Sequence, residues 1–398
     1  MSAFELSREH QEFRRSVREF AEAELAPHIA GWDRAHHFPV DVVQKMGALG
    51  LMGLAAPEQY GGAGEDGDFT SLCVAIEEIG RVDQSLGITL EAAVGLGINP
   101  ILTYGSEEQK ATWLPDLVAG RRLAGFGLTE PGAGSDAGAT RTRAEIDPAS
   151  GEWVVNGGKQ FITNSGSEIT SVVTVTARTG SRADGSAEIS AIMIPAGTPG
   201  FVAEPAYDKL GWNISDTHPL SFTDVRVPAD HLLGERGRGY AQFLATLDDG
   251  RVAIAALATG LIQACLEQCV AYAGERQTFG GPIGRKQGVA FQIADLEVML
   301  QASRLLTYQA AAMKDAMLRG GGPSVGEFKR AASVAKLYTS ESAVTATRIA
   351  TQIFGGYGFM EEYPVARFYR DAKILEIGEG TSEVQRMLIA RGLGLPVE

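Results

Sequence analysis

The spacing of apolar residues changes twice along the 398-residue chain, and these two changes constrain the fold more than any other feature. Up to about residue 122, apolar residues such as Phe13, Val17 and Phe20 recur at helical spacing. Short β-rich runs separated by Gly, Asp and Asn follow, with no helical pattern between them. From residue 236, three long apolar helical segments come in a row. The sequence therefore predicts an α+β fold: an N-terminal helical domain (1–122), a middle antiparallel β domain (123–235) and a C-terminal helical bundle domain (236–398).

Charge and composition exclude several classes of function. The 35 Lys and Arg residues against 49 Asp and Glu give a net charge of −14, which argues against general binding of nucleic acid or an anionic membrane. No stretch resembles a signal or transit peptide, and no uncharged apolar run approaches 18 residues, so no membrane insertion is expected. The cysteines Cys73, Cys265 and Cys269 form no CxxC pair and are predicted to be reduced core thiols of a cytoplasmic protein.

Catalytic motifs of hydrolases and metal enzymes are missing from the sequence. The six histidines are scattered without ligand spacing, and the chain has no HExxH, GxSxG or Walker sequence. We therefore expect no metal site.

Two glycine-rich or aromatic segments in the middle region can hold a ligand. TEPGAGSDAGAT (129–140) lacks the GxGxxG spacing, so it is interpreted either as a plain loop or as a turn whose N–H groups and Thr129 and Ser135 hydroxyls face a ligand. KQFITN (159–164) places Phe161 and Thr163 on one face of a strand. These residues could hold a planar ligand or belong to an ordinary surface strand.

Three segments of the C-terminal region also have alternative interpretations. Arg276 of RQTFGGPIGRKQ (276–287) could bind a pyrophosphate or cap a helix, and QIFGGYGF (352–359) is a glycine turn at a helix end. In EIGEGTSEVQR (376–386), Glu379 lies between two glycines before a helix, with Ser382 and Gln385 spaced as a capping box. Glu379 is either a surface-turn carboxylate or a group that approaches a ligand closely.

Taken together and in this order, these segments resemble the acyl-CoA dehydrogenase family, as does RDAKI (370–374). The resemblance covers essentially the whole chain. It implies an N-terminal helical domain, a middle β domain and a C-terminal four-helix bundle. It also implies FAD as cofactor and the removal of two hydrogens from an acyl-CoA thioester, giving the trans-2-enoyl-CoA.

The resemblance also assigns roles to individual residues. Glu379 would be the base that removes the α-proton, while the β-hydride passes to flavin N5. The backbone N–H of Glu379 and a ribityl hydroxyl would bind the thioester carbonyl, and desolvation would raise the pKa of the base. Residues implied to bind FAD are Phe126, Leu128, Thr129, Gly134, Ser135, Phe161, Ile162, Thr163, Thr381 and Glu383. Those implied to bind the FAD of a neighbouring subunit are Arg276, Thr278, Phe279, Gln287, Gln352, Ile353, Phe354, Gly355 and Gly356. Substrate contacts would be Ser135, Asp248, Arg251 and Gly380, although Asp248 and Arg251 could instead mark an exposed helix start.

Two departures from the family pattern bear on the site. Gly378 stands where many relatives carry a bulky residue, which would open the acyl pocket. Gly250 stands where some relatives carry the base, which strengthens the assignment to Glu379. The acyl pocket would be lined by residues of the glycine-rich helix, namely Ala92, Val94, Gly95 and Ile98, with Glu91 narrowing it. We expect a short or branched acyl chain from fatty-acid or branched-chain amino-acid breakdown.

The resemblance further implies a homotetramer arranged as a dimer of dimers, with electron-transferring flavoprotein as the electron acceptor. Alternatives are an acyl-CoA oxidase or flavin monooxygenase that reacts with oxygen, and a non-catalytic acyl-CoA-binding relative that has lost FAD. The glutamate at 379 disfavours the monooxygenase, and the intact TEPGAGSD and Arg276–Phe279 segments disfavour the non-catalytic relative.

Overall fold

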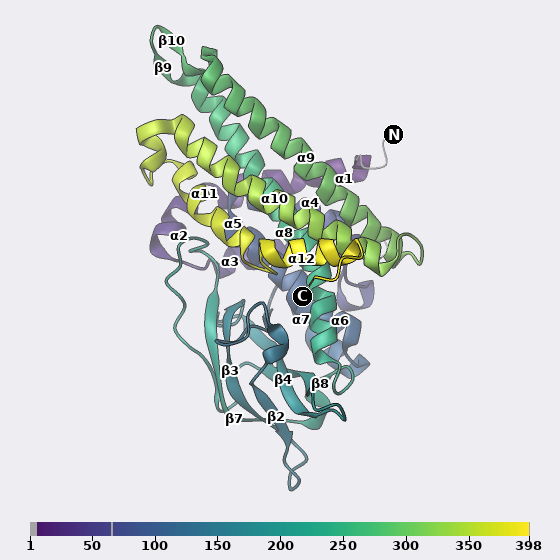
Figure 1. Cartoon of the computed structure of the whole chain (residues 1–398). Coiled ribbons are helices and arrows are strands. Elements are labelled where there is room, and N and C mark those ends of the chain that lie inside the picture. The colour runs from purple at the N-terminus through teal and green to yellow at the C-terminus, as the bar shows by residue number, and fades with distance from the viewer. Residues whose placement is uncertain (1–5, 65–66, 398) are drawn as a thin grey trace.

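The structure is a computed structural model that describes residues 6–64 and 67–397. Its helices gather in one body and strands such as β2, β3, β4 and β7 in another (Figure 1). The element order is helices, strands, helices, as the sequence predicts.

The N-terminal helices begin where the sequence supplies caps. Ser7, Asp68 and Asp83 each accept a hydrogen bond from the backbone N–H three residues later, which satisfies one of the free donors of a helix start. A π-helical stretch, Ala92–Ile98, continues the helix between α5 and α6. The helices are α1 (Arg8–Phe20), α2 (Ile29–Ala35), α3 (Val40–Ala48), α4 (Phe69–Val82), α5 (Gln84–Glu91), α6 (Asn99–Tyr104) and α7 (Glu107–Val118).

The middle region forms an eight-stranded sheet in the order β6-β7-β3-β2-β4-β5-β8, with β1 also beside β4. The prediction of a purely antiparallel sheet is wrong in part, because β1 and β2 each pair with β4 in parallel. Long connections separate these partners, which allows them to run in the same direction. The strands are β1 (Leu123–Gly127), β2 (Arg143–Ile146), β3 (Trp153–Thr163), β4 (Thr170–Ser181), β5 (Ala187–Pro195), β6 (Phe201–Ala203), β7 (Thr217–Val227) and β8 (Leu232–Leu233).

The C-terminal region is built around one long buried helix. Helix α8 packs against α4, α9 and α10, and the shorter α11 and α12 pack against α10. A small hairpin of two short strands joins α8 to α9. The elements are α8 (Gly239–Glu275), β9 (Gln277–Thr278), β10 (Gly281–Pro282), α9 (Gln287–Leu318), α10 (Val325–Phe354), α11 (Pro364–Ala372) and α12 (Ser382–Gly392). All three cysteines are free and buried, as predicted.

Two helical segments are longer and more apolar than the sequence led us to expect. Gln84–Tyr104 and Gly239–Glu275 are long and apolar enough, by composition, to cross a membrane. However, 72% and 78% of their most apolar windows are buried inside the fold. Helices that are apolar all round are typical of the core of a large protein, and these two fill that position.

The RDAKI segment ties the three regions together. Asp371 accepts a hydrogen bond from the backbone N–H of Trp212, 2.7 Å away, in the loop before β7. Arg370 pairs with Asp33 of α2 at 2.7 Å, and Arg367, one turn earlier, pairs with the buried Asp83. These bonds fix the middle domain and the N-terminal helices against the segment that leads into Glu379.

Candidate active site

Glu379 occupies a tight turn between a 3₁₀ helix, Lys373–Glu376, and α12. Its backbone has a φ of 51°, a left-handed conformation uncommon for a residue with a side chain. Two side chains hold this turn by its carbonyls. Gln385 Nε2 donates to the carbonyl oxygens of Glu379 and Gly380, at 3.3 and 2.9 Å, and Lys336 Nζ donates to that of Gly380 at 2.8 Å. Strained backbone held in this way is typical of functional sites.

The cap of α12 differs from the predicted one. Thr381, rather than Ser382, is the N-cap, and its hydroxyl accepts from the N–H of Val384 at 3.3 Å. The side chain of Gln385 bonds the turn instead of the cap, so the proposed capping box is wrong. Because the N-cap is Thr381, one residue earlier than predicted, Glu379 lies two residues before the cap.

The carboxylate of Glu379 is buried although the residue as a whole is half-buried. Neither carboxylate oxygen has a hydrogen-bond donor among the described residues. Helix α8 passes so close that a Cβ at Gly250 would lie 2.0 Å from Glu379 Oε2. The absence of a side chain at Gly250 thus leaves the space that the Glu379 carboxylate occupies.

Burial sets the protonation of this site. It raises the pKa of Glu379 to about 7, although the adjacent Glu91 and the charges of Lys336 and Arg251 act in the opposite direction. Burial, with the adjacent Glu379, raises the pKa of Glu91 well above its usual range. Glu379 is therefore poised to exchange a proton near neutral pH.

Two cations face the carboxylate from neighbouring helices. Lys336 of α10 is completely buried, and burial lowers its pKa to about 8. Arg251 of α8 pairs with Asp248, and both are buried within the helix, so the exposed-helix-start interpretation is wrong. Sequence reasoning missed Lys336. A single lysine among the small and apolar residues of AASVAKLYTS was the available signal.

The predicted flavin-facing residues lie at the carboxyl ends of β1 and β3 and in the turn after β1. Phe126 is buried and stacks on Phe243 of α8 with ring centroids 3.9 Å apart.

Phe161, by contrast, is 61% exposed at a φ of 62°, with its ring 5.2 Å from that of Tyr207. Thr163 is half-buried, whereas Ile162 points into the core of the middle domain and offers only its backbone. Leu128 is buried, Thr129 half-buried and Ser135 exposed, while Gly134 has open space around it.

A buried ion pair fixes the TEPGAGSD turn behind this surface. Lys159 Nζ lies 2.7 Å from a carboxylate oxygen of Glu130 and 3.2 Å from the carbonyl of Leu128. Glu130 also accepts from the backbone N–H groups of Arg141 and Thr142. The glutamate and lysine of these two motifs therefore have a structural role that the sequence did not reveal.

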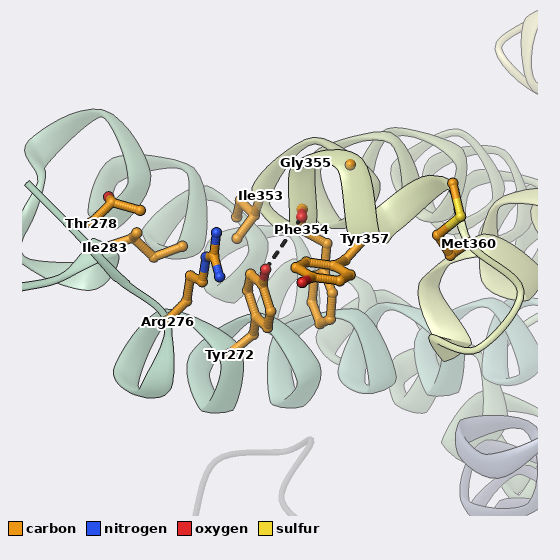
Figure 2. A pocket seen from close by; sticks show the side chains of 10 residues that line it. Tyr272, Arg276, Thr278, Ile283, Ile353, Phe354, Gly355, Tyr357 and Met360 are labelled. Atoms are coloured by element: carbon orange, nitrogen blue, oxygen red, sulfur yellow. Dashed lines mark hydrogen bonds between the residues drawn. The ribbon is translucent and has the colours of Figure 1, made fainter.

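The second predicted FAD cluster lies at the far end of α8. A cavity of about 470 Å³ opens there, and Figure 2 shows the side chain of Arg276 between Ile283 and the ring of Tyr272. The guanidinium lies 5.6 Å from the ring centre of Tyr357, and no carboxylate of residues 6–64 or 67–397 pairs with it. The lining consists of Tyr272, Arg276, Thr278, Ile283, Ile353, Phe354, Gly355, Gly356, Tyr357 and Met360. Phe279, Gln287 and Gln352 are exposed and do not line it.

One chain does not bring the two predicted FAD clusters together. The β9–β10 hairpin, which follows Arg276, lies at the opposite end of the molecule from the sheet that carries Phe161 (Figure 1). Gly380, Thr381 and the exposed Glu383 accompany Glu379 at the start of α12, which lies between these two ends.

Comparison with known proteins identifies the family. The N-terminal, middle and C-terminal domain models of acyl-CoA dehydrogenase match residues 7–121, 125–225 and 237–394. A Bacillus subtilis (strain 168) protein named probable acyl-CoA dehydrogenase YngJ is 47% identical over 98% of this chain and 99% of its own.

Solved structures agree with this assignment. Butyryl-CoA dehydrogenase from Megasphaera elsdenii superposes with a TM-score of 0.92 at 40% identity, covering 98% of this chain and 99% of that one. An acyl-CoA dehydrogenase from Bacillus anthracis, complexed with FAD, has a TM-score of 0.89 at 32% identity, covering 100% of this chain and 70% of that one. The protein, an oxidoreductase by these matches, belongs to the acyl-CoA dehydrogenase family.

Proposed function

We propose that this enzyme removes the α- and β-hydrogens of a short-chain acyl-CoA, with Glu379 as the base that takes the α-proton. One observation carries the proposal: a buried carboxylate with a pKa of about 7 lies in a strained, firmly held turn. The α-proton of a thioester is only weakly acidic, so a base must have a raised pKa and a site from which water is excluded. The ionised form of Glu379, dominant above about pH 7, accepts the proton on a carboxylate oxygen.

The turn also offers a donor for the thioester oxygen. The backbone N–H of Glu379 has no acceptor among the described residues. In the proposed complex this N–H binds the thioester carbonyl and stabilises the negative charge that develops on its oxygen. Because Lys336 and Gln385 fix the neighbouring carbonyls, this donor needs no reorganisation during the reaction.

The residues present fit FAD. The Phe161 ring is free to lie against a planar ligand, and Gly134 has open space where a side chain would stand. Arg276 has no carboxylate partner among the described residues, so its guanidinium is available to bind a pyrophosphate bidentately. When bound, FAD supplies the acceptor for the β-hydride.

Because the sheet that carries Phe161 and the β9–β10 hairpin that follows Arg276 lie far apart in one chain, each FAD is held by two subunits in this proposal. A dimer is then the smallest active unit, and a homotetramer built as a dimer of dimers is the proposed assembly. Exposed apolar side chains on α9 support further contact between subunits: Phe291, Val298 and Leu305 recur every seven residues, which places them on one helix face. Electron-transferring flavoprotein as acceptor and a cytoplasmic location complete the proposal.

A short acyl chain is supported by the similar butyryl-CoA dehydrogenase and by the shape of the site. Gly378 leaves room beside the base, since a Cβ there would meet only Ile374, 3.4 Å away. The π-helical stretch closes in from the other side: a Cβ at Gly97 would lie 3.1 Å from Ala124 of β1. The site thus has room beside Gly378 and close packing between the π-helical stretch and β1. Branched chains with few carbons fit the same description.

Anaerobic bleaching of the flavin by a panel of acyl-CoAs tests the proposal. We expect rapid bleaching by four-carbon and short branched thioesters and slower bleaching as the chain lengthens. An enzyme that holds FAD but is bleached by none of them would contradict the proposal. Bleached enzyme that recovers its colour in air within one turnover, with peroxide formed, would favour the oxidase alternative.

A further inference from the structure

Glu91 places a second carboxyl group directly against the base. It lies at the last residue of α5, where the π-helical stretch begins, and its side chain is completely buried. Its carboxyl group is within hydrogen-bonding reach of that of Glu379. All four carboxyl oxygens are buried, and none has a hydrogen-bond partner among the described residues. A proton on one of the two groups would let it donate a hydrogen bond to the other.

Two glycines make room for this pair. A Cβ at Gly95, one turn beyond Glu91, would lie 2.9 Å from Glu91 Oε1. A Cβ at Gly250 on α8 would lie 2.0 Å from Glu379 Oε2. A side chain at either position would push one carboxyl group away from the other. The surrounding backbone, from two separate helices, is thus shaped to hold both groups together.

The charges around the pair decide which member carries the proton. Two adjacent carboxyl groups in a dry site cannot both ionise, so they share one proton over a wide pH range. The neighbouring cations, Lys336 of α10 and Arg251 of α8, act on Glu379, whereas Glu91 is faced by Glu379 alone. Glu376 and Glu383 influence the pair only through Lys336. The negative charge is therefore most stable on Glu379 and the proton on Glu91.

We propose that Glu91 is a positioning residue for the base: it stays protonated and donates a hydrogen bond that holds the Glu379 carboxylate in place for α-proton removal. The inference rests on the proposed function and deepens it. The substrate proton goes to Glu379, while Glu91 keeps its own proton throughout. The hydrogen bond fixes one carboxylate oxygen and leaves the other for the substrate.

Two substitutions separate hydrogen bonding from mere packing. Glu91→Gln keeps the shape and supplies an N–H donor that does not titrate, whereas Glu91→Leu supplies none. As a control, Thr259→Val removes a buried hydroxyl of α8 that donates to the carbonyl of Ala255 in its own helix. The pH dependence of the anaerobic bleaching rate is measured for all four proteins after FAD saturation.

We expect Glu91→Gln and Thr259→Val to keep the wild-type midpoint pH. In Glu91→Leu the midpoint should rise by about one to two units, because a charge-assisted hydrogen bond to Glu379 is lost. Its rate at neutral pH should fall by about tenfold or more for the same reason. An unchanged midpoint in Glu91→Leu, or equal shifts in the Gln and Leu variants, would overturn the inference.

A second readout does not depend on turnover. At about pH 8 ordinary carboxyl groups are ionised, so the infrared C=O stretch reports the few that stay protonated. The difference spectrum of wild type minus Glu91→Gln should contain one such band, and a spectrum without it would count against a protonated Glu91. Failure of wild type to bleach with any acyl-CoA would refute the proposed function while leaving this spectrum to decide the proton's position.

Discussion

The two ends of helix α8 show opposite kinds of site. Near Gly250 the chain itself supplies the proposed base, a second carboxyl group and two cations, whose charged groups are buried and come from four different elements. Near Arg276 it supplies an arginine without a carboxylate partner among the described residues, and beside it Phe279, which is 94% exposed. The first site is complete enough for proton transfer within one subunit. In the proposed assembly, the second is a half-site that another subunit completes.

Removing the base should break the chemistry of the first site and leave the second intact. Glu379→Gln should lower the anaerobic bleaching rate by about 10³-fold or more, because an amide cannot accept the α-proton. FAD content and acyl-CoA binding should stay at wild-type levels. Glu341→Gln, which changes a glutamate that pairs with Arg386, is the control. Substantial turnover in Glu379→Gln would show that another group is the base.

Displacing the base should have the next largest effect. Gly250→Ala puts a methyl group where Glu379 Oε2 lies, so the carboxylate must move, and a shift of about 1 Å can cost about 10²-fold in rate. Gly274→Ala on the same helix has open space and should bleach at the wild-type rate. Equal rates in both variants would show that the turn around Glu379 relaxes freely.

Changing Arg276, at the other end of α8, should lower FAD retention and leave the bleaching rate of the FAD-saturated enzyme nearly unchanged. Arg276→Ala should weaken FAD retention by about tenfold or more, because a charge-assisted pair with a phosphate is lost. Once saturated with FAD, this variant should bleach at close to the wild-type rate. Dialysis followed by absorbance measurement gives the FAD content, and Arg319→Ala, at the distant end of α9, is the control. Wild-type retention in Arg276→Ala would remove the case for a shared site.

The smallest expected effect concerns stability and pH. Folding raises the pKa of Glu379 from 4.5 to about 7, which favours the protonated form in the folded state. The group therefore costs stability as the pH rises from 4.5 through 7, and this cost is absent at lower pH. In the FAD-free protein, Glu379→Gln should raise the free energy of unfolding at pH 8 by about 1 to 2 kcal/mol. Urea titrations at pH 4 and 8 measure it; an equal difference at both pH values would show that burial does not raise this pKa.

The sequence predicted the domain order because this order depends on local patterns. Helical spacing and β-rich runs are each visible within a few residues. The role of Glu379 as the base came from the resemblance to the family and stays a prediction. The parallel pairing of β1 and β2 with β4 was missed because nothing in a strand's own residues fixes its neighbour's direction. The capping error had a similar origin, since both Thr381 and Ser382 can cap a helix and the choice depends on where Lys336 and Gln385 hold the turn.

The sequence also did not reveal which groups surround Glu379. Glu91 was expected only to narrow the acyl pocket, since a lone glutamate on an apolar helix does not reveal what it faces. Its partner is 288 positions away, and their meeting depends on the π-helical stretch and on Gly250. Buried pairs such as Lys159 and Glu130 were missed for the same reason: charged residues look alike in sequence whether solvated or paired inside a core.

The separation of Glu379 from Arg276 has a genetic consequence. If each FAD is shared between two subunits as proposed, a mixed dimer of a Glu379→Gln chain and an Arg276→Ala chain has one composite site that carries both defects. The other site receives its glutamate from the second chain and its arginine from the first, and both are intact. Co-expression of the two alleles should therefore produce a centre that has both the glutamate and the arginine, which neither homodimer contains.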